Sequence, residues 1–225
     1  MPEPIRIIST KKLLSNQKQY LLNAGFSVIE SDFIKTEDLP FSMPILHDSL
    51  LFTSQNAVHS ILRHADLTTL QHKDVFCVGT KTKALLEANG FTVIACTGYA
   101  AELADYITQH YPQTSFTFFN GNLRRDTLPE ALHLAGIAFN EVTVYATLLT
   151  PHPIKTKANG ILFFSPSGVE SYLKENTITD EMCFCIGTTT AEALENTTQN
   201  RIIANQPTIE NTIIQCLNHF KSVSS

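Results

Sequence analysis

Residues 76–82 read FCVGTKT, and residues 184–190 repeat the stretch as FCIGTTT. The repeat extends on both sides: with a shift of 108 residues, VFCVGTKTKALLE (75–87) falls on CFCIGTTTAEALE (183–195), with seven of thirteen positions identical. A shift of 111 residues places LLFTSQNAVHSILR (50–63) on ILFFSPSGVESYLK (161–174), and LLNAG (21–25) on LHLAG (132–136). Three matching blocks in the same order indicate a duplication in which each copy is about half of the chain.

Short apolar runs alternate with helix-length segments in both copies. The runs are nearly continuous, which is typical of parallel strands covered on both faces. Segment 128–135 has apolar residues at helical spacing, and Gly25, Gly90 and Gly136 stand where helices are expected to end. These features predict an α/β fold of two similar lobes, with parallel sheets flanked by helices. The expected strands are 5–8, 50–52, 75–78, 91–95, 116–119, 161–164, 183–186 and 202–204, and the extended stretches 27–40 and 140–153 are expected to cross between the lobes.

The composition is that of a globular protein: 43% of the 225 residues are hydrophobic and 16% are charged. The formal net charge of −5 argues against duplex nucleic acid as a partner, although a cleft in an acidic protein can be locally positive. The N-terminal MPEPIRIISTKKLL does not resemble a secretory signal, and no apolar stretch is long enough to span a membrane. Five cysteines without a C-x-x-C pair favour a reducing compartment, so we expect a cytoplasmic protein.

Several motifs of cofactor and metal sites are absent from the sequence. There is no G-x-G-x-x-G fingerprint and no complete phosphate-binding loop. The eight histidines form no H-x-x-x-H pair and are not spaced with cysteines as metal ligands usually are. We therefore expect chemistry that uses neither a cofactor nor a metal ion.

The repeated loops combine a strand end, hydroxyl side chains and a helix start. After Gly79 and Gly187 we expect Thr80 and Thr188 to be helix N-caps, with Thr82 and Thr190 in the first turn. Free amides at such helix starts form an anion site. The second loop pair, FTSQNAV (52–58) and FFSPSGV (163–169), offers side chains that cap a helix or contact a ligand. These are Ser54, Ser165 and Ser167. For both loop pairs, helix capping without a ligand is the alternative interpretation.

Two further features stand near the predicted strand ends. FFNGNLRRDTLPEAL (118–132) places Arg124 and Arg125 before a helix, where a positive charge opposes the helix dipole. A bound anion explains such arginines, and simple solvent exposure is the alternative, which we favour for Arg124. Tyr145 interrupts the extended apolar run 142–149. A tyrosine there usually serves packing, but at a junction of lobes its phenol can reach a ligand.

Taken together, these motifs resemble the uroporphyrinogen-III synthase family. The resemblance covers most of the chain and rests on LLFTSQNAV (50–58), VFCVGTKTKALLEANGF (75–91), FFNGNLRRDTLPEALHLAGIAFNEVTVYAT (118–147), ILFFSPSGVESYL (161–173) and CFCIGTTTAEAL (183–194). It implies two α/β domains joined by a two-stranded β connector. Domain 1 would be discontinuous, with residues 1–35 and 151–225, domain 2 would span 38–148, and 36–37 with 149–150 would form the connector.

The resemblance also implies an activity. The substrate would be hydroxymethylbilane, a linear tetrapyrrole with eight carboxylates, which loses water and closes with ring D inverted to give uroporphyrinogen III in haem biosynthesis. The enzyme would be a hydro-lyase that uses no cofactor. It would be a monomer that binds neither nucleic acid nor membrane, and a transient contact with the preceding deaminase is an open alternative. The rival interpretations are a non-catalytic two-lobed binding protein for a polyanionic small molecule and a regulatory module derived from the synthase.

By matching positions, the resemblance assigns roles to individual residues. Tyr145 stands in the V-Y-x-T motif and would assist departure of the hydroxyl group, while Arg125 matches a basic position in a G-x-x-x-R segment. Residues that would bind substrate carboxylates are Ser54, Thr82, Ser165, Ser167 and Thr190. The chain departs from the family at Gln55, where proline often follows the T-S pair, which affects the expected loop shape around Ser54.

Overall fold

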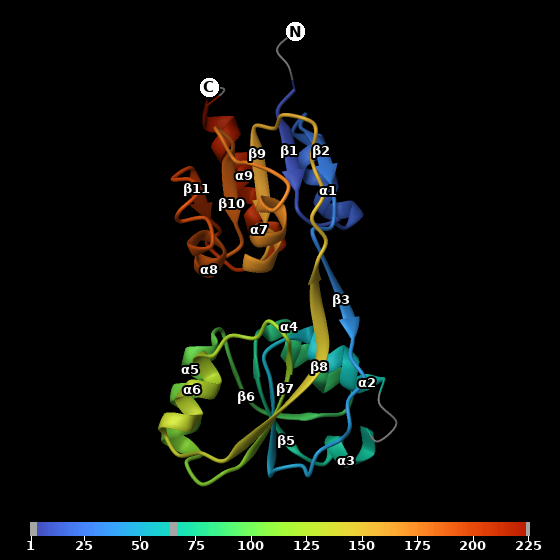
Figure 1. Ribbon diagram of the computed structural model, residues 1–225, viewed down its shortest axis with the longest axis vertical. Helices are drawn as coiled ribbons and strands as arrows, with labels where there is room; N and C mark the ends of the chain where they lie inside the picture. Colours follow the sequence, from blue (N-terminus) through green and yellow to red (C-terminus); the bar gives the residue numbers. More distant parts are fainter. Residues whose placement is uncertain (1–3, 64–66, 224–225) are drawn as a thin grey trace. The chain divides into compact units, whose positions relative to one another are not determined.

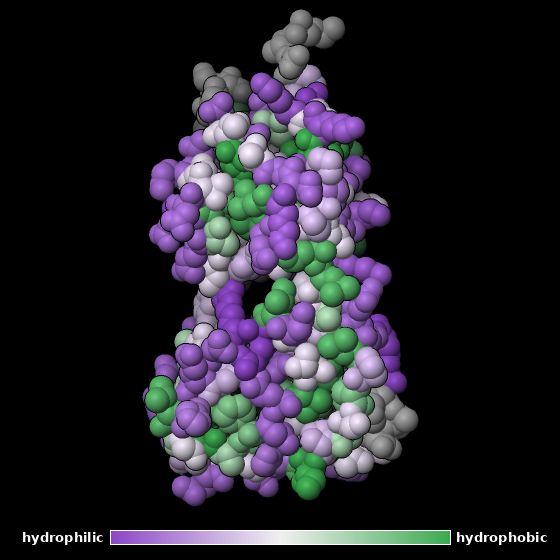
Figure 2. All heavy atoms as spheres, in the orientation of Figure 1, coloured by the Kyte–Doolittle hydropathy of each residue, from purple (hydrophilic) through white to green (hydrophobic). Residues whose placement is uncertain are grey.

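The computed structural model describes residues 4–63 and 67–223, with side chains up to residue 221. The chain divides into two compact units (Figure 1). Unit 1 comprises Met1–Lys35 and Leu148–Ser225, and unit 2 comprises Thr36–Thr147. On the visible face of each unit, hydrophilic and hydrophobic residues are interspersed (Figure 2), as is usual for a protein surface.

Unit 2 contains a six-stranded sheet in the order β3-β8-β7-β4-β5-β6. The neighbouring pairs from β8 to β6 are parallel. Leu50 and Phe52 of β4 pack with helices α2, α3 and α4, whereas Leu51 packs with α5 and α6. Both faces are therefore covered, which explains the continuous apolar runs. The elements are β3 (Ile34–Asp38), β4 (Ser49–Phe52), α2 (Gln55–Leu62), α3 (Leu67–Gln71), β5 (Asp74–Val78), α4 (Thr80–Ala88), β6 (Thr92–Thr97), α5 (Ala100–His110), β7 (Phe116–Gly121), α6 (Thr127–Leu134) and β8 (Phe139–Leu149).

Unit 1 contains a five-stranded parallel sheet in the order β11-β10-β9-β1-β2. Ile161 and Phe163 of β9 pack with helices α7 and α8, whereas Leu162 packs with α1 and α9. This sheet is likewise covered on both faces. The elements are β1 (Arg6–Ser9), α1 (Ser15–Asn23), β2 (Ser27–Glu30), β9 (Gly160–Phe163), α7 (Pro166–Leu173), β10 (Met182–Cys185), α8 (Thr188–Glu192), β11 (Arg201–Ile203) and α9 (Ile209–Val223).

The two units have the same strand order apart from the additional β3. In unit 2 the order β6-β5-β4-β7-β8 corresponds to third-second-first-fourth-fifth strand, which is the doubly wound order. In unit 1, β11-β10-β9 take the first three places, and the N-terminal strands β1 and β2 take the fourth and fifth. Unit 1 is thus a circular permutation of the unit 2 arrangement. The predicted fold class, an α/β protein of two similar parallel-sheet lobes, is confirmed.

Strands β3 and β8 carry the chain between the units. The amide of Thr150 donates to the carbonyl of Phe33 and that of Leu39 to Val144, so the two strands run antiparallel. Both stretches predicted to cross between the lobes also contribute strands to the sheets. Stretch 27–40 begins with β2, which belongs to the unit 1 sheet, and stretch 140–153 includes the part of β8 that pairs with β7 in unit 2.

The helix starts differ from the prediction at the repeated glycines. The N-caps of α4 and α8 are Gly79 and Gly187, and the helices begin at Thr80 and Thr188, so the expected threonine caps are wrong. At Gly79 the backbone has φ +89°, a conformation that favours glycine, whereas Gly187 is extended with φ −169°. In both loops the threonine after the glycine is already the first helical residue, so the cap falls one residue earlier. Neither glycine can supply a side-chain cap.

Candidate active site

Four of the predicted site residues lie at one edge of the unit 2 sheet. Ser54 follows β4, Thr82 follows β5, and Arg125 follows β7. Tyr145 in β8 pairs with Gly121, the last residue of β7. Because neighbouring parallel strands end at the same edge, these residues lie around the carboxyl ends of β5, β4, β7 and β8. The sheet winds in opposite directions from β4 and β7, and ligands of doubly wound folds bind at this point.

Tyr145 lies directly against the backbone of Gly121. A Cβ atom added at Gly121 would be 2.3 Å from Cζ of Tyr145 and 2.7 Å from its hydroxyl oxygen, so only glycine accommodates the ring. The strand pairing shifts register between Asn120 and Gly121, and this irregularity brings Tyr145 rather than Val144 opposite Gly121. The tyrosine is half-buried and contacts the core beneath it. Its position is therefore closely defined.

Two asparagines hold the β7–β8 pairing on either side of Tyr145. Asn120 Oδ1 accepts a hydrogen bond from the hydroxyl of Thr143 at 3.0 Å. The side chain of Asn122 accepts from the amide of Thr147 at 2.8 Å, and the amide of Asn122 donates to the carbonyl of Tyr145 at 3.2 Å. Neither asparagine was in the predicted site. An N-G-N sequence at a strand end is the signal that could have identified them.

Arg124 is engaged in ion pairs, so its predicted role as a simple solvent-exposed charge is wrong. Its guanidinium contacts Asp126 and holds both carboxylate oxygens of Glu141, one of them at 2.8 Å. The hydrogen bond to Glu141 raises the pKa of Arg124, against the lowering effect of its burial, so the side chain remains charged. Its charge is balanced within the protein. The neighbouring Arg125 has an exposed side chain and remains the candidate for a ligand anion.

Ser54 and Ser165 are the N-caps of α2 and α7. The hydroxyl oxygen of Ser54 accepts a hydrogen bond from the amide of Asn56 at 3.1 Å, and that of Ser165 accepts from the amide of Gly168 at 3.0 Å. Ser165 is also within 3.0 Å of the hydroxyl of Ser167. A capping hydroxyl uses its oxygen as acceptor and keeps its O–H as a donor. The capping role is therefore compatible with ligand binding.

Thr82 and Thr190 occupy the third positions of α4 and α8. They are only 4% and 1% exposed, yet neither side chain forms a hydrogen bond with any residue that the structure describes. In the described part of the chain, the fully buried side-chain oxygens without a hydrogen-bond partner are Asn140 Oδ1 and Ser171 Oγ, so the unpaired hydroxyls of Thr82 and Thr190 retain some exposure. In lacking a partner the two threonines differ from the capping serines, and a helix cap does not account for them.

The unit 1 residues gather at the corresponding edge of their own sheet. Ser165 and Ser167 follow β9, and Thr190 follows the neighbouring strand β10. The hydroxyl of Thr10 at the end of β1 donates to the carbonyl of Leu162 at 2.8 Å, which joins β1 to the β9 end. Each unit thus presents hydroxyl groups and helix-start amides at the carboxyl edge of its sheet, an arrangement suited to carboxylate groups.

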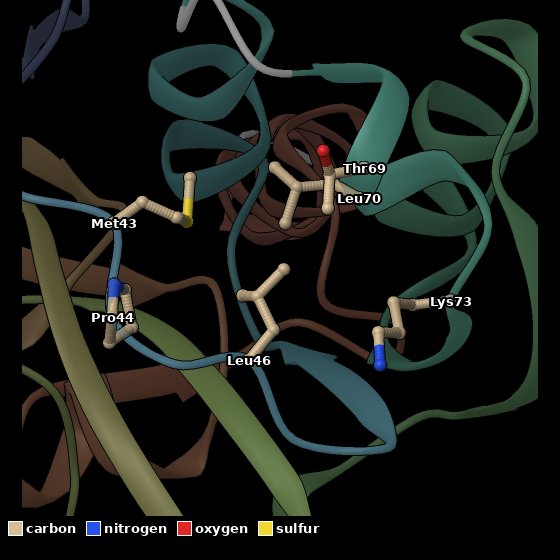
Figure 3. A pocket seen from close by; sticks show the side chains of 6 residues that line it. All are labelled: Met43, Pro44, Leu46, Thr69, Leu70 and Lys73. Atoms are coloured by element: carbon tan, nitrogen blue, oxygen red, sulfur yellow. The ribbon is translucent and has the colours of Figure 1, made fainter.

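Within residues 4–63 and 67–223, no group of three or more His, Cys, Asp or Glu is placed to hold a metal ion, and no helix is long and apolar enough to cross a membrane. A hollow of about 340 Å³ occurs in unit 2 (Figure 3), beside the segments that precede β4 and β5 and so at the opposite edge of the sheet. It is lined by Met43, Pro44, Leu46, Thr69, Leu70 and Lys73.

The fold and these edges define a class: a duplicated, doubly wound α/β protein with hydroxyl groups and helix-start amides at the carboxyl edge of each sheet. The family model of uroporphyrinogen-III synthase HemD matches residues 15–214. The chain belongs to the uroporphyrinogen-III synthase family, which supports the enzyme interpretation over the non-catalytic binding protein.

Individual relatives agree with this membership. The chain is 28% identical over 168 residues to uroporphyrinogen-III synthase of Chlorobaculum parvum, covering 65% of this chain and 68% of that protein. It is 30% identical over 115 residues to uroporphyrinogen-III synthase of Saccharomyces cerevisiae, covering 44% of this chain and 42% of that protein. The fold is similar to uroporphyrinogen-III synthetase of Helicobacter pylori, with a TM-score of 0.73 and 19% identity over 96% of this chain and 99% of that one. The fold is also similar to that of a mutant uroporphyrinogen-III synthase of Thermus thermophilus, with a TM-score of 0.67 and 15% identity over 97% of this chain and 99% of that one.

Proposed function

We propose that the chain is a hydro-lyase that converts hydroxymethylbilane into uroporphyrinogen III without a cofactor. The observation that carries the proposal is Tyr145, held on Gly121 at the same sheet edge as Ser54 and Thr82. The family membership supplies the substrate class. We further propose that the protein works as a cytoplasmic monomer and receives its substrate from the deaminase that makes it.

In the proposed reaction, the terminal C–O bond of the bilane breaks, and the hydroxyl group takes up a proton and leaves as water. The phenol of Tyr145 donates a hydrogen bond to this leaving oxygen. The resulting azafulvene cation is attacked by the substituted carbon of ring D, which forms a spiro intermediate. The bond from this carbon to the methylene group of ring C then breaks, and the methylene group bonds to the unsubstituted α-carbon of ring D, which inverts the ring. Loss of the proton from that carbon restores the aromatic pyrrole and returns the proton taken up in the first step. The protein mainly supplies the geometry, which can lower a barrier substantially.

The carboxylates of the bilane are proposed to bind at the two sheet edges. Ser54, Thr82 and Arg125 would hold carboxylates on unit 2, and Ser165, Ser167 and Thr190 on unit 1. The first amides of α2, α4 and α7 add donors that carry no formal charge. Such binding would hold ring D so that its substituted carbon reacts, whereas the spontaneous reaction closes the ring without inversion.

The test is a coupled assay in which a deaminase supplies hydroxymethylbilane and the product isomers are separated. We expect the type III isomer, formed faster than spontaneous closure. Formation of the type I isomer alone, at the rate seen without the protein, would refute the proposed activity.

Tyr145→Phe tests the assigned catalytic group. Because the phenol acts on the leaving hydroxyl, turnover should fall by about 10- to 100-fold while KM changes little. Tyr20→Phe is the control, because Tyr20 is 61% exposed on α1. Equal turnover of the two variants would remove Tyr145 from the catalytic role.

A further inference from the structure

The loop that follows β1, residues 10–14 (TKKLL), is the counterpart in unit 1 of the loop that carries Arg125 in unit 2. In the shared strand order, β1 beside β9 occupies the place of β7 beside β4. Both loops therefore stand where the winding direction of their sheet changes. No residue of 10–14 was in the predicted site.

The backbone of this loop is anchored beside the serines of unit 1. Thr10 donates to the carbonyl of Leu162 from its amide at 3.1 Å and from its hydroxyl at 2.8 Å. A Cβ atom added at Gly168 would be 3.2 Å from Ser165 Oγ and 3.8 Å from Thr10 Oγ1, so both hydroxyls lie within reach of one atom. The loop thus adjoins the Ser165 cap.

The two lysines of the loop differ in their surroundings. The amide of Lys12 donates to Asp32 at 2.8 Å, and the Lys12 side chain lies near the carboxylate of Glu30, which is paired with Lys18. The side chain of Lys11 is exposed and forms no ion pair with any residue in the described part of the chain. The backbone of Lys11 is held, since its carbonyl accepts from the hydroxyl of Ser9 at 2.6 Å. Lys11 therefore presents an unbalanced charge from an anchored loop.

Each of the two loops also exposes a leucine. Leu14 is 65% exposed, and Leu123 in the unit 2 loop is 52% exposed. A basic group beside an exposed apolar side chain suits a ligand that carries carboxylates on an apolar ring. Thr190 at the same edge of unit 1 adds a hydroxyl without a hydrogen-bond partner among the described residues.

We propose that Lys11 binds a carboxylate of the linear tetrapyrrole on unit 1, with Leu14 contacting the pyrrole ring that bears it. The inference rests on the proposed function and adds a binding residue to it. It gives unit 1 a basic ligand group, as Arg125 gives one to unit 2.

Lys11→Gln tests this role, with Lys157→Gln as the matched control. Lys157 precedes β9, at the opposite edge of the same sheet, and its substitution changes the net charge equally. Loss of a charge-assisted contact should raise KM about tenfold in Lys11→Gln. KM in Lys157→Gln should change less than about twofold, as expected for a screened surface charge. Lys11→Arg should restore most of the affinity, and the effect of Lys11→Gln should shrink as salt is added.

The same KM in Lys11→Gln and Lys157→Gln would overturn the inference, and so would a loss of kcat with unchanged KM. Binding of uroporphyrin III, measured through the fluorescence of the porphyrin, distinguishes failure of the Lys11 inference from failure of the proposed function. A wild-type protein that forms no type III isomer refutes the activity. Weaker uroporphyrin binding by Lys11→Gln than by Lys157→Gln would still support the lysine site, and equal binding would refute it.

Discussion

Gly121→Ala is the substitution whose effect the structure defines most closely. The new Cβ would lie 2.3 Å from Cζ and 2.6 Å from Cε2 of Tyr145, whereas ordinary contacts begin at 3.4 Å. The ring must therefore retreat by about 1 Å, although it contacts the core and its backbone is tied to Asn122. Overpacking of this kind costs about 1–3 kcal/mol of stability. A displacement of about 1 Å at a reacting group can cost about 100-fold in rate.

The assay combines unfolding in denaturant with initial rates of type III isomer formation. Gly98→Ala is the matched control, because a Cβ there would meet only Glu102 Oε2, at 3.4 Å. We expect Gly121→Ala to lose about 100-fold in kcat and to unfold at lower denaturant concentration. Gly98→Ala should match the wild type in both measurements.

The same substitution in a Tyr145→Phe background identifies the cause of the rate loss. The phenylalanine ring keeps the steric conflict at Cζ but has no hydroxyl group, so the stability cost should persist. Turnover should then fall by about threefold at most, because the function of the phenol is already lost. Full additivity of the two rate effects would refute the argument that Gly121 acts by positioning the hydroxyl, as would an unchanged kcat in the single variant.

Two further variants test the two threonines and an ion pair. The hydroxyls of Thr82 and Thr190 have no hydrogen-bond partner among the described residues. Replacing both threonines with valine should therefore weaken uroporphyrin binding about tenfold without lowering the free energy of unfolding. A loss of stability in denaturant would show instead that the two hydroxyls stabilise the fold. Burial raises the pKa of Glu30, but hydrogen bonds from Lys18 and the Leu13 amide outweigh it and the net pKa is lowered. Glu30→Gln should therefore reduce stability at pH 7, and this difference should fade as the pH falls below about 4; equal urea midpoints at pH 7 would contradict this.

The sheets were predictable because their signals are local. Each of the eight apolar runs became a strand, since a strand buried on both faces needs apolar residues at every position. Gly25, Gly90 and Gly136 all have positive φ angles after helices α1, α4 and α6, as their positions indicated. The duplication was visible because equivalent strand-loop-helix segments kept both their pattern and their spacing.

The features that escaped prediction depend on partners distant in sequence. Arg124 looked like an exposed charge because its carboxylate partner, Glu141, stands 17 positions away on the neighbouring strand. The place of Tyr145 opposite Gly121 depends on a register shift that no periodicity encodes. The permuted order of unit 1 arises because β1 and β2, at the start of the chain, join strands that come more than 100 residues later.

An acidic chain and a polyanionic ligand are compatible because charge is distributed locally. The net charge is −5, and the positive charge of Arg124 is balanced by Glu141 and Asp126. The remaining donors at the two edges are hydroxyls and helix-start amides, which need no formal charge to hold a carboxylate. Basic groups are then needed only where one particular carboxylate of the ligand must be distinguished from the others, which is the role proposed for Arg125 and Lys11. Such a site distinguishes positions on the ligand, whereas a uniformly positive surface would attract the polyanion in any orientation.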